Sequence, residues 1–252
     1  AIDQLNYMTQ QTDSYAAYAQ STFAFNDRWS GTLGLRYTRD EKDFFVSQVL
    51  MAPNAPSPLP PTSQSDSWSD TSLRAGLDVR VTDDVLLYLS VAEGFKSGGF
   101  NGRARKPSEL EGYDPETILA WEIGMKSEWL DRRLRLNAAA FFSDYQDVQL
   151  TEQRLEGQTQ TIVTQNAGDA EIRGLELELE ARPVPQLRLN ASLGYLDAEY
   201  TRISAAAGAS GLTLQHKLIG TPEWTAAAGA EYTIPASERG EVVLRADYSY
   251  RA

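Results

Sequence analysis

Apolar and polar residues alternate along many stretches of this 252-residue sequence. The clearest case starts at Leu87, where every second residue is aliphatic: Leu87, Leu89 and Val91. A period of two predicts β-strands that have one apolar and one polar face. We expect about ten strands, over residues 14–25, 29–39, 72–81, 87–92, 117–129, 133–145, 174–182, 187–195, 224–232 and 242–250.

A helical interpretation of the same pattern fails. Residues 175–180 read Leu-Glu-Leu-Glu-Leu-Glu, and a helical repeat of about 100° would spread these glutamates over every side of a helix. In strands, leucine, valine and alanine share one face, which we expect to contact lipid. The opposite face is expected to line a wet lumen, and its charged residues include Arg74, Asp78, Glu176, Glu178, Glu180 and Arg188.

Short and long connections alternate between the expected strands. Turns of a few residues fall near positions 27, 83, 131, 185 and 237, and long loops near 40–70, 98–114, 146–168 and 197–222. Five prolines between Pro53 and Pro61 support the first long loop, because proline cannot join a ladder; a linker between two domains is the alternative. Outer-membrane barrels place short turns in the periplasm and long loops outside. We therefore predict an all-β fold, a transmembrane antiparallel up-and-down β-barrel with long extracellular loops.

Aromatic residues are spaced as the two interfaces of a bilayer require. Trp121 and Trp129 fall on one face, eight residues apart, and so do Trp224 and Tyr232. At about 3.3 Å per residue and a tilt of about 40°, eight residues cover roughly 20 Å of bilayer height. We expect these four side chains to form lipid-facing aromatic girdles.

Composition narrows the possible functions. The net charge of −12 disfavours nucleic acid as a partner. Cysteine is absent and His216 is the single histidine, so thiolate metal sites and paired imidazoles are excluded. No apolar run approaches the roughly 18 residues of a membrane helix, but a barrel needs none. The first ten residues, AIDQLNYMTQ, do not combine a basic and an apolar segment as a signal peptide would, and we expect a segment cut from a longer precursor.

Four stretches carry a family resemblance: GLRYTRDEKDF (34–44), VAEGFKSGGFNGR (91–103), PETILAWEIGMKSEWLDRRLRLNAAAFFSDYQDVQL (115–150) and NAGDAEIRGLELELEARP (166–183). With these stretches the chain resembles the β-barrel domain of TonB-dependent outer-membrane receptors of the ferric-siderophore type, from end to end. The resemblance implies a barrel of 22 strands, of which residues 1–252 are a segment of about ten. It also implies a plug domain and a TonB box, both expected outside this sequence, and a place in the outer membrane of a Gram-negative bacterium.

The glycine-rich stretch after Leu87 is the candidate ligand site. Aromatic and cationic residues on an outer loop suit an anionic, catechol-like or haem-like ligand; those expected to touch ligand are Phe95, Lys96, Phe100, Arg103 and Tyr113. A flexible loop without a ligand is the alternative. A phosphate-binding loop is disfavoured, because Pro107 interrupts the helix that such a loop requires.

Three functions remain open from the sequence. The first is a receptor that imports scarce iron chelates with energy from TonB, or by the same route haem, cobalamin or carbohydrate. The second is a passive, porin-like channel. The third is an outer-membrane enzyme, which we do not expect, because Asp144, Asp147 and the lone His216 form no evident nucleophile and base. We expect no cofactor and no resident metal; the expected partners are outer-membrane lipid, an iron chelate and the TonB complex.

Overall fold

The computed structural model describes residues 4–50, 59–104, 107–156, 159–237 and 240–252. These residues contain one ten-stranded antiparallel sheet in the order β1-β2-β3-β4-β7-β8-β9-β10-β11-β12. Its strands are β1 (Gln4–Ala24), β2 (Trp29–Leu50), β3 (Thr62–Thr82), β4 (Val85–Lys96), β7 (Glu116–Trp129), β8 (Leu134–Glu156), β9 (Thr159–Val184), β10 (Leu187–Ile203), β11 (Trp224–Ser237) and β12 (Gly240–Arg251). The expected all-β, up-and-down architecture is confirmed. No helix of this part of the chain is long and apolar enough to cross a membrane.

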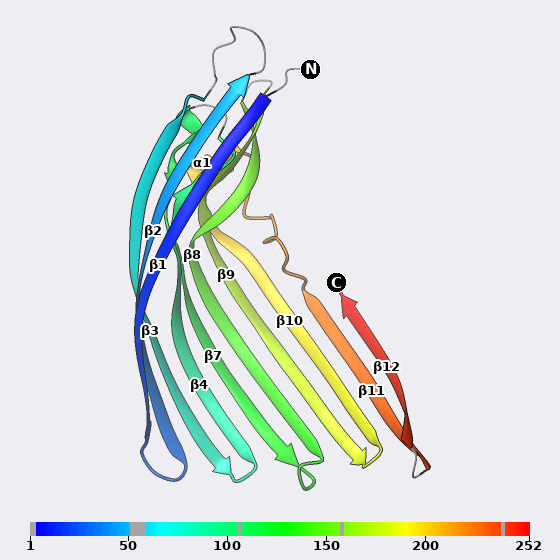
Figure 1. The fold of residues 1–252 in the computed structure, drawn as a ribbon. Helices are drawn as coiled ribbons and strands as arrows, with labels where there is room; N and C mark the ends of the chain where they lie inside the picture. The colour runs from blue at the N-terminus through cyan, green and yellow to red at the C-terminus, as the bar shows by residue number, and fades with distance from the viewer. Residues whose placement is uncertain (1–3, 51–58, 105–106, 157–158, 238–239) are drawn as a thin grey trace.

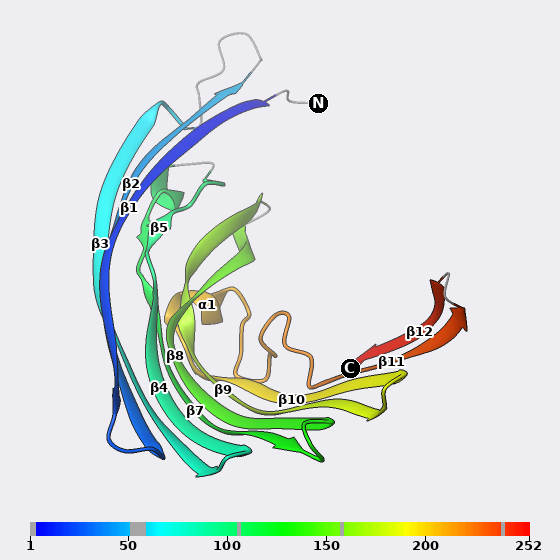
Figure 2. The same cartoon turned by 60° about the horizontal axis from the view of Figure 1, so that its bottom comes forward.

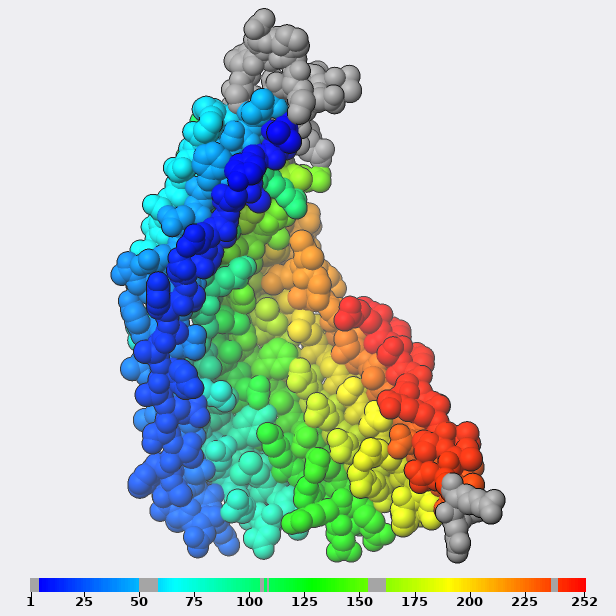
Figure 3. Space-filling model, in the orientation of Figure 1, coloured from blue at the N-terminus to red at the C-terminus, as the bar shows by residue number. Residues whose placement is uncertain are grey.

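The sheet is a curved wall whose connections are sorted by length. In Figure 1 the short turns lie together at the bottom, and the longer connections lie at the opposite end, called the outer end below. Figure 2 shows the wall as an arc, with β5 (Gly99–Phe100) and the short helix α1 (Ala205–Ala209) on its concave side. The strands form a continuous surface from the blue N-terminal strand to the red C-terminal one (Figure 3). The long connections β4–β7 and β10–β11 lie at the outer end as predicted, whereas β8 and β9 are joined there by a connection as short as the turns at the other end.

Two of the predicted long loops are wrong, because the strands continue through most of them. The β2–β3 ladder runs to the pair Val46–Thr62, inside the loop expected at 40–70, whose residues 51–58 lie outside the described part. The β8–β9 ladder runs to Glu156–Thr159, inside the loop expected at 146–168. These outer parts contain many polar residues on both faces, so the apolar alternation disappears while the backbone pairing continues.

The two faces of the wall differ as expected. The convex face exposes large aliphatic side chains that a soluble protein would bury, and these include Leu33, Leu73, Leu89, Ile123, Leu175, Leu177 and Leu193. On the concave face, polar side chains of neighbouring strands meet: Asn137 Nδ2 donates to Glu178 at 3.3 Å, and Arg135 Nη1 to Glu180 at 3.4 Å. The sheet therefore has one apolar and one polar surface.

The sheet splits at its outer end between β3 and β4. Their ladder stops at the pair Arg74–Ala92, although β3 continues to Thr62 and β4 to Lys96. At the last rung, the Glu93 carboxylate accepts a hydrogen bond from the Leu73 backbone N–H at 2.9 Å. A carboxylate thus satisfies a donor that the missing strand pair would leave free. Above it, the wall consists of two separate leaves, β1–β3 and β4–β12.

Candidate ligand site at the outer end

The connection between β4 and β7, residues 97–115 and called the crown below, folds onto the concave side of the wall. Its two-residue strands β5 and β6 (Gly112–Tyr113) pair with each other, and the 3₁₀ helix η1 (Pro107–Glu109) lies between them. The crown is therefore a folded unit and not a free loop. It begins and ends on the β4–β12 leaf, and Figure 2 shows it inside the arc.

Glycine in the crown is required by close packing. A Cβ on Gly98 would lie 2.3 Å from the Tyr113 carbonyl oxygen and 2.7 Å from the Trp68 indole. A Cβ on Gly99 would lie 2.5 Å from the Tyr113 hydroxyl. The glycine run thus lets the crown approach its own second strand and the β3 wall.

Phe100 anchors the crown to the other leaf. Its ring stacks on Phe44 of β2 with centroids 5.5 Å apart, and lies 6.1 Å from the Trp68 ring of β3. Phe100 is only 9% exposed, and Leu59 and Leu110 complete the same buried cluster. Among the expected ligand residues, Phe100 is thus covered by the chain itself.

Lys42 of β2 adds a hydrogen bond to the contact between the crown and the β1–β3 leaf. Its Nζ donates to the Gly98 carbonyl at 2.6 Å and lies 5.4 Å from the Trp68 ring centroid. Burial lowers the pKa of Lys42, and the Asp40 carboxylate opposes that shift. The Gln48 Nε2 also donates to the Ala104 carbonyl, at 3.1 Å. The crown therefore joins the two leaves above the point where their ladder stops.

The remaining expected ligand residues lie in different surroundings. Lys96, whose side chain is 62% exposed, pairs with the buried Glu116 carboxylate at 3.1 Å. Arg103 is exposed near the crown tip, and Phe95 and Tyr113 are half-buried. Two cations thus lie at the outer end, Lys96 at the end of β4 and Arg103 in the crown, with the Tyr113 ring in the second stem. Phe95 lies on the convex face, because it alternates in phase with Leu87 and Leu89 along β4.

The two stems of the crown are held by amide side chains of β8 and β9. Gln149 and Asn166 form a cross-strand pair in the β8–β9 ladder. Gln149 Nε2 donates to the Ser97 and Asp114 carbonyls, both at 3.0 Å. Asn166 Nδ2 donates to the Asp114 carbonyl at 2.9 Å, and its Oδ1 accepts from the Asp114 N–H at 2.8 Å.

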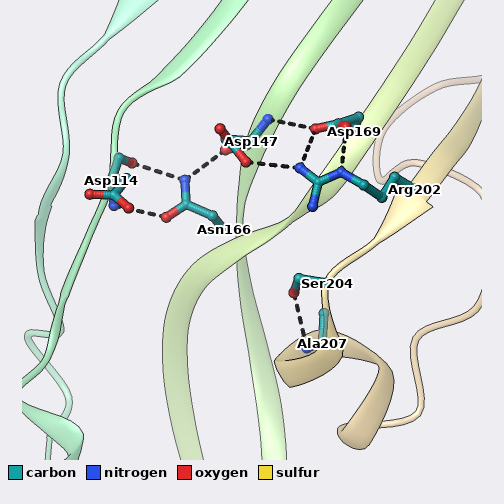
Figure 4. A network of polar contacts seen from close by, with 7 residues as sticks. All are labelled: Asp114, Asp147, Asn166, Asp169, Arg202, Ser204 and Ala207. Carbon is teal, nitrogen blue, oxygen red and sulfur yellow. Dashed lines mark hydrogen bonds and ion pairs between the residues drawn. The ribbon is translucent and has the colours of Figure 1, made fainter.

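Polar contacts continue from this pair across three strands (Figure 4). Asn166 Nδ2 also donates to the Asp147 carbonyl at 2.8 Å, and Arg202 of β10 bridges the carboxylates of Asp147 and Asp169 at 3.0 and 2.6 Å. The hydrogen bonds from Arg202 lower the pKa of Asp169. On the other side, the Gln149 N–H donates to Glu116 at 2.6 Å. We call these residues, Glu116, Asp147, Gln149, Asn166, Asp169 and Arg202, the polar belt.

The backbone bends where the polar belt forms. The β8–β9 register shifts between Tyr145 and Val148, and Asp147 has a φ of 53°. Opposite it, Gly168 has a φ of 149°, and a Cβ there would lie 1.9 Å from the Arg202 carbonyl oxygen. The interrupted ladder leaves backbone groups that the side chains of the belt satisfy. This site could not be predicted from the sequence, because residues 146–168 lack an apolar alternation and were expected to form a loop. The motifs SDYQDVQL and NAGDAEIRG contain four of its six residues.

The other residues selected from the sequence lie apart from the crown. Trp121, Trp129, Trp224 and Tyr232 are 45%, 48%, 42% and 44% exposed, and their role at the lipid interface stays a prediction. His216 is exposed, and its Nδ1 accepts from the Thr213 N–H at 3.1 Å within a local turn. Near the belt, Ser204 Oγ accepts from the Ala207 N–H and caps α1 (Figure 4).

Comparison with known sequences identifies relatives. The sequence model of the family described as TonB dependent receptor-like, beta-barrel, matches residues 2–252. The metal-pseudopaline receptor CntO of Pseudomonas aeruginosa is 29% identical over 193 residues, which are 77% of this chain and 25% of that protein. The pesticin receptor of Yersinia pestis is 26% identical over 204 residues, 81% of this chain and 28% of that protein. The chain thus spans about a quarter of the length of these curated relatives.

Solved structures share the fold. The ferric yersiniabactin uptake receptor FyuA from Yersinia pestis superposes with a TM-score of 0.78 at 22% identity, over 98% of this chain and 35% of that one. The siderophore receptor PiuA from Acinetobacter baumannii gives 0.71 at 20% identity, over 96% of this chain and 34% of that one. By the family match, the sheet with its exposed aliphatic face is part of the wall of a Gram-negative outer-membrane β-barrel. The chain belongs to the TonB-dependent receptor β-barrel family.

Proposed function

We propose that residues 1–252 are one segment of the barrel domain of a receptor that imports a metal chelate of the siderophore class, with energy supplied through TonB. The observation that carries the proposal is the crown, a folded unit on the concave side that presents Arg103 and lies beside Lys96, the last residue of β4. Anionic chelates are attracted by such cations. Relatives named as metal-pseudopaline and siderophore receptors support this ligand class.

The crown's construction suits a ligand-binding part better than a pore lining. Phe100 and Lys42 fix it to the β1–β3 leaf, and Gln149 fixes both of its stems. A surface that is already ordered loses little conformational entropy when a ligand binds. Lys96, Arg103 and Tyr113 are the chain's proposed ligand contacts, with Phe100 as their support. Phe95 is left out of this set, because it shares the convex face with Leu87 and Leu89. We propose no catalytic role for the chain.

The test is uptake of radioactive iron by cells that produce the full-length receptor. Iron is supplied as catecholate, hydroxamate and carboxylate chelates, in strains with and without TonB. The double variant Lys96→Gln, Arg103→Gln should weaken binding of the imported chelate, and more so at low salt. The matched control is Arg28→Gln, which removes an exposed cation from the short-turn end. Import that persists without TonB would instead identify a passive channel, and equal effects of both variants would remove the crown from the site.

A further inference from the structure

Gln149 and Asn166 form a clamp of two amides around the stems of the crown. Together they donate three hydrogen bonds to the crown's stem carbonyls, two of them to the single carbonyl oxygen of Asp114. That oxygen has two lone pairs, and the two amides use both. The clamp therefore touches the crown where it leaves β4, at Ser97, and where it returns toward β7, at Asp114.

Amide side chains are required at both positions by the groups they meet. Asn166 faces two carbonyls, of Asp114 and Asp147, and one N–H, of Asp114. Only a side chain with two donors and an acceptor matches that set, and an amide is such a group. A carboxylate of the same size would place oxygen against the carbonyl oxygens. Glutamate at 149 would likewise oppose the carbonyls of Ser97 and Asp114.

The other residues of the polar belt hold the two clamp residues in place. The Asn166 amide holds the Asp147 carbonyl, and the Asp147 N–H donates to Asp169 at 3.0 Å. Asp169 is bound by both Nε and Nη2 of Arg202, at 2.6 and 2.8 Å. On the other side of the clamp, the buried Glu116 carboxylate accepts from Gln149 N–H and from the Tyr145 hydroxyl. The clamp is thus tied to β7, β8, β9 and β10 at once.

Because the wall is split at its outer end, the position of the crown depends on this clamp. Above Arg74–Ala92 no ladder joins β3 to β4, so the crown spans two leaves. Its tip rests on β2 and β3 through Phe100, and its stems rest on β8 and β9 through the clamp. If the clamp is lost, the crown remains attached through the Lys96–Glu116 pair of the β4–β7 ladder and through Phe100, and the segment between these two points can move.

We propose that Gln149 and Asn166 are positioning residues for ligand binding, which set the place of the crown over the concave face without touching ligand. The consequence for ligand rests on the proposed function, whereas the consequence for the crown does not. Each isosteric change, Gln149→Glu or Asn166→Asp, should release the stems while leaving the ten-stranded ladder in place.

The first measurement reports crown motion and needs no ligand. A nitroxide label at Glu111→Cys, an exposed crown position, is recorded by electron paramagnetic resonance in the full-length receptor in lipid vesicles. A second label at Thr151→Cys reports the β8–β9 hairpin itself. The matched control is Gln146→Glu, which adds the same charge at an exposed position three residues from Gln149.

The expected result is a mobile component at position 111 in Asn166→Asp and Gln149→Glu, with little change in Gln146→Glu. The label at position 151 should stay immobile in all variants. An unchanged crown label in both clamp variants would overturn the proposal. Equal mobility at positions 111 and 151 would also overturn it, because the amides would then merely stabilise the hairpin.

The second measurement is affinity for the ferric chelate that the parent receptor imports in the uptake test. If the crown is in place about a tenth of the time, the affinity falls about tenfold. Unchanged affinity with a mobile crown would overturn the positioning role. If the parent receptor binds no chelate of the panel, the proposed function fails, while the spectra still decide whether the clamp holds the crown.

Discussion

Replacing Leu177 by arginine should destabilise the protein far more than replacing its neighbour Glu178. Leu177 is 41% exposed on the convex face and pairs with Ala138 of β8. Ala138 pairs in turn with Met125, which lies midway between Trp121 and Trp129. Four residues at about 3.3 Å and a tilt of about 40° place each girdle about 10 Å away. With the girdles placed as predicted, Leu177 lies between them, within the hydrocarbon region of the bilayer.

An arginine at the midplane of a barrel's lipid face costs roughly 2–4 kcal/mol, and near the interface about 0–1 kcal/mol. Leu177→Arg should fall in the first range. Glu178 lies on the concave face, and its change to arginine removes one exposed hydrogen bond from Asn137, worth about 1 kcal/mol or less. The assay is reversible guanidinium unfolding of the full-length protein in lipid vesicles. Equal costs, or a larger cost for Glu178→Arg, would refute the assignment of the faces.

Three further predictions concern the crown and the polar belt at the outer end. Phe100→Ala should leave outer-membrane abundance nearly unchanged but raise protease cleavage within residues 97–115, because its ring is the crown's anchor on Phe44 and Trp68; cleavage equal to the parent's would contradict that role. Deleting residues 99–112 should abolish chelate uptake and preserve the ladder, which contains none of them; retained uptake would exclude the crown from binding. Arg202 lowers the pKa of Asp169, so the ion pair contributes its full stabilisation above the ordinary carboxyl pKa of about 4 and loses it as the pH falls through the lowered pKa. Crown mobility should therefore stay constant between about pH 5 and 8. A rise in mobility within that range would contradict a lowered pKa.

The membrane-spanning part of the fold could be predicted from the sequence because lipid and water impose a strict rule on every second residue. At 174–182 the alternating leucines and glutamates fit only a strand with one apolar and one polar face, and each short turn pairs two consecutive strands as an antiparallel hairpin. Beyond the girdles that rule ends. Residues 40–48, 148–156 and 159–166 pair as strands through their backbone, which leaves no comparable pattern in the side chains.

The site could be predicted only in part, for a related reason. The long connection near residues 98–114 was predicted correctly from its local run of glycines, and the ligand contacts of Lys96 and Arg103 stay a prediction. The burial of Phe100 depends on Phe44 and Trp68, which reach it only because β2 and β3 extend past the apolar region. The clamp depends on the strand register that places Gln149 opposite Asn166. That register results from a shift of the β8–β9 pairing at Asp147, which the local sequence pattern does not predict.

The curved wall should separate lipid on its convex face from water on its concave face. The most direct test is a scan of nitroxide labels, one at a time, along residues 174–182 of the full-length receptor in vesicles. Collision with lipid-soluble oxygen and with a water-soluble nickel chelate is measured at each position. Oxygen access should peak at 175, 177, 179 and 181, and nickel access at the positions between them. A scan without this period of two, or with the two reagents exchanged, would contradict the account.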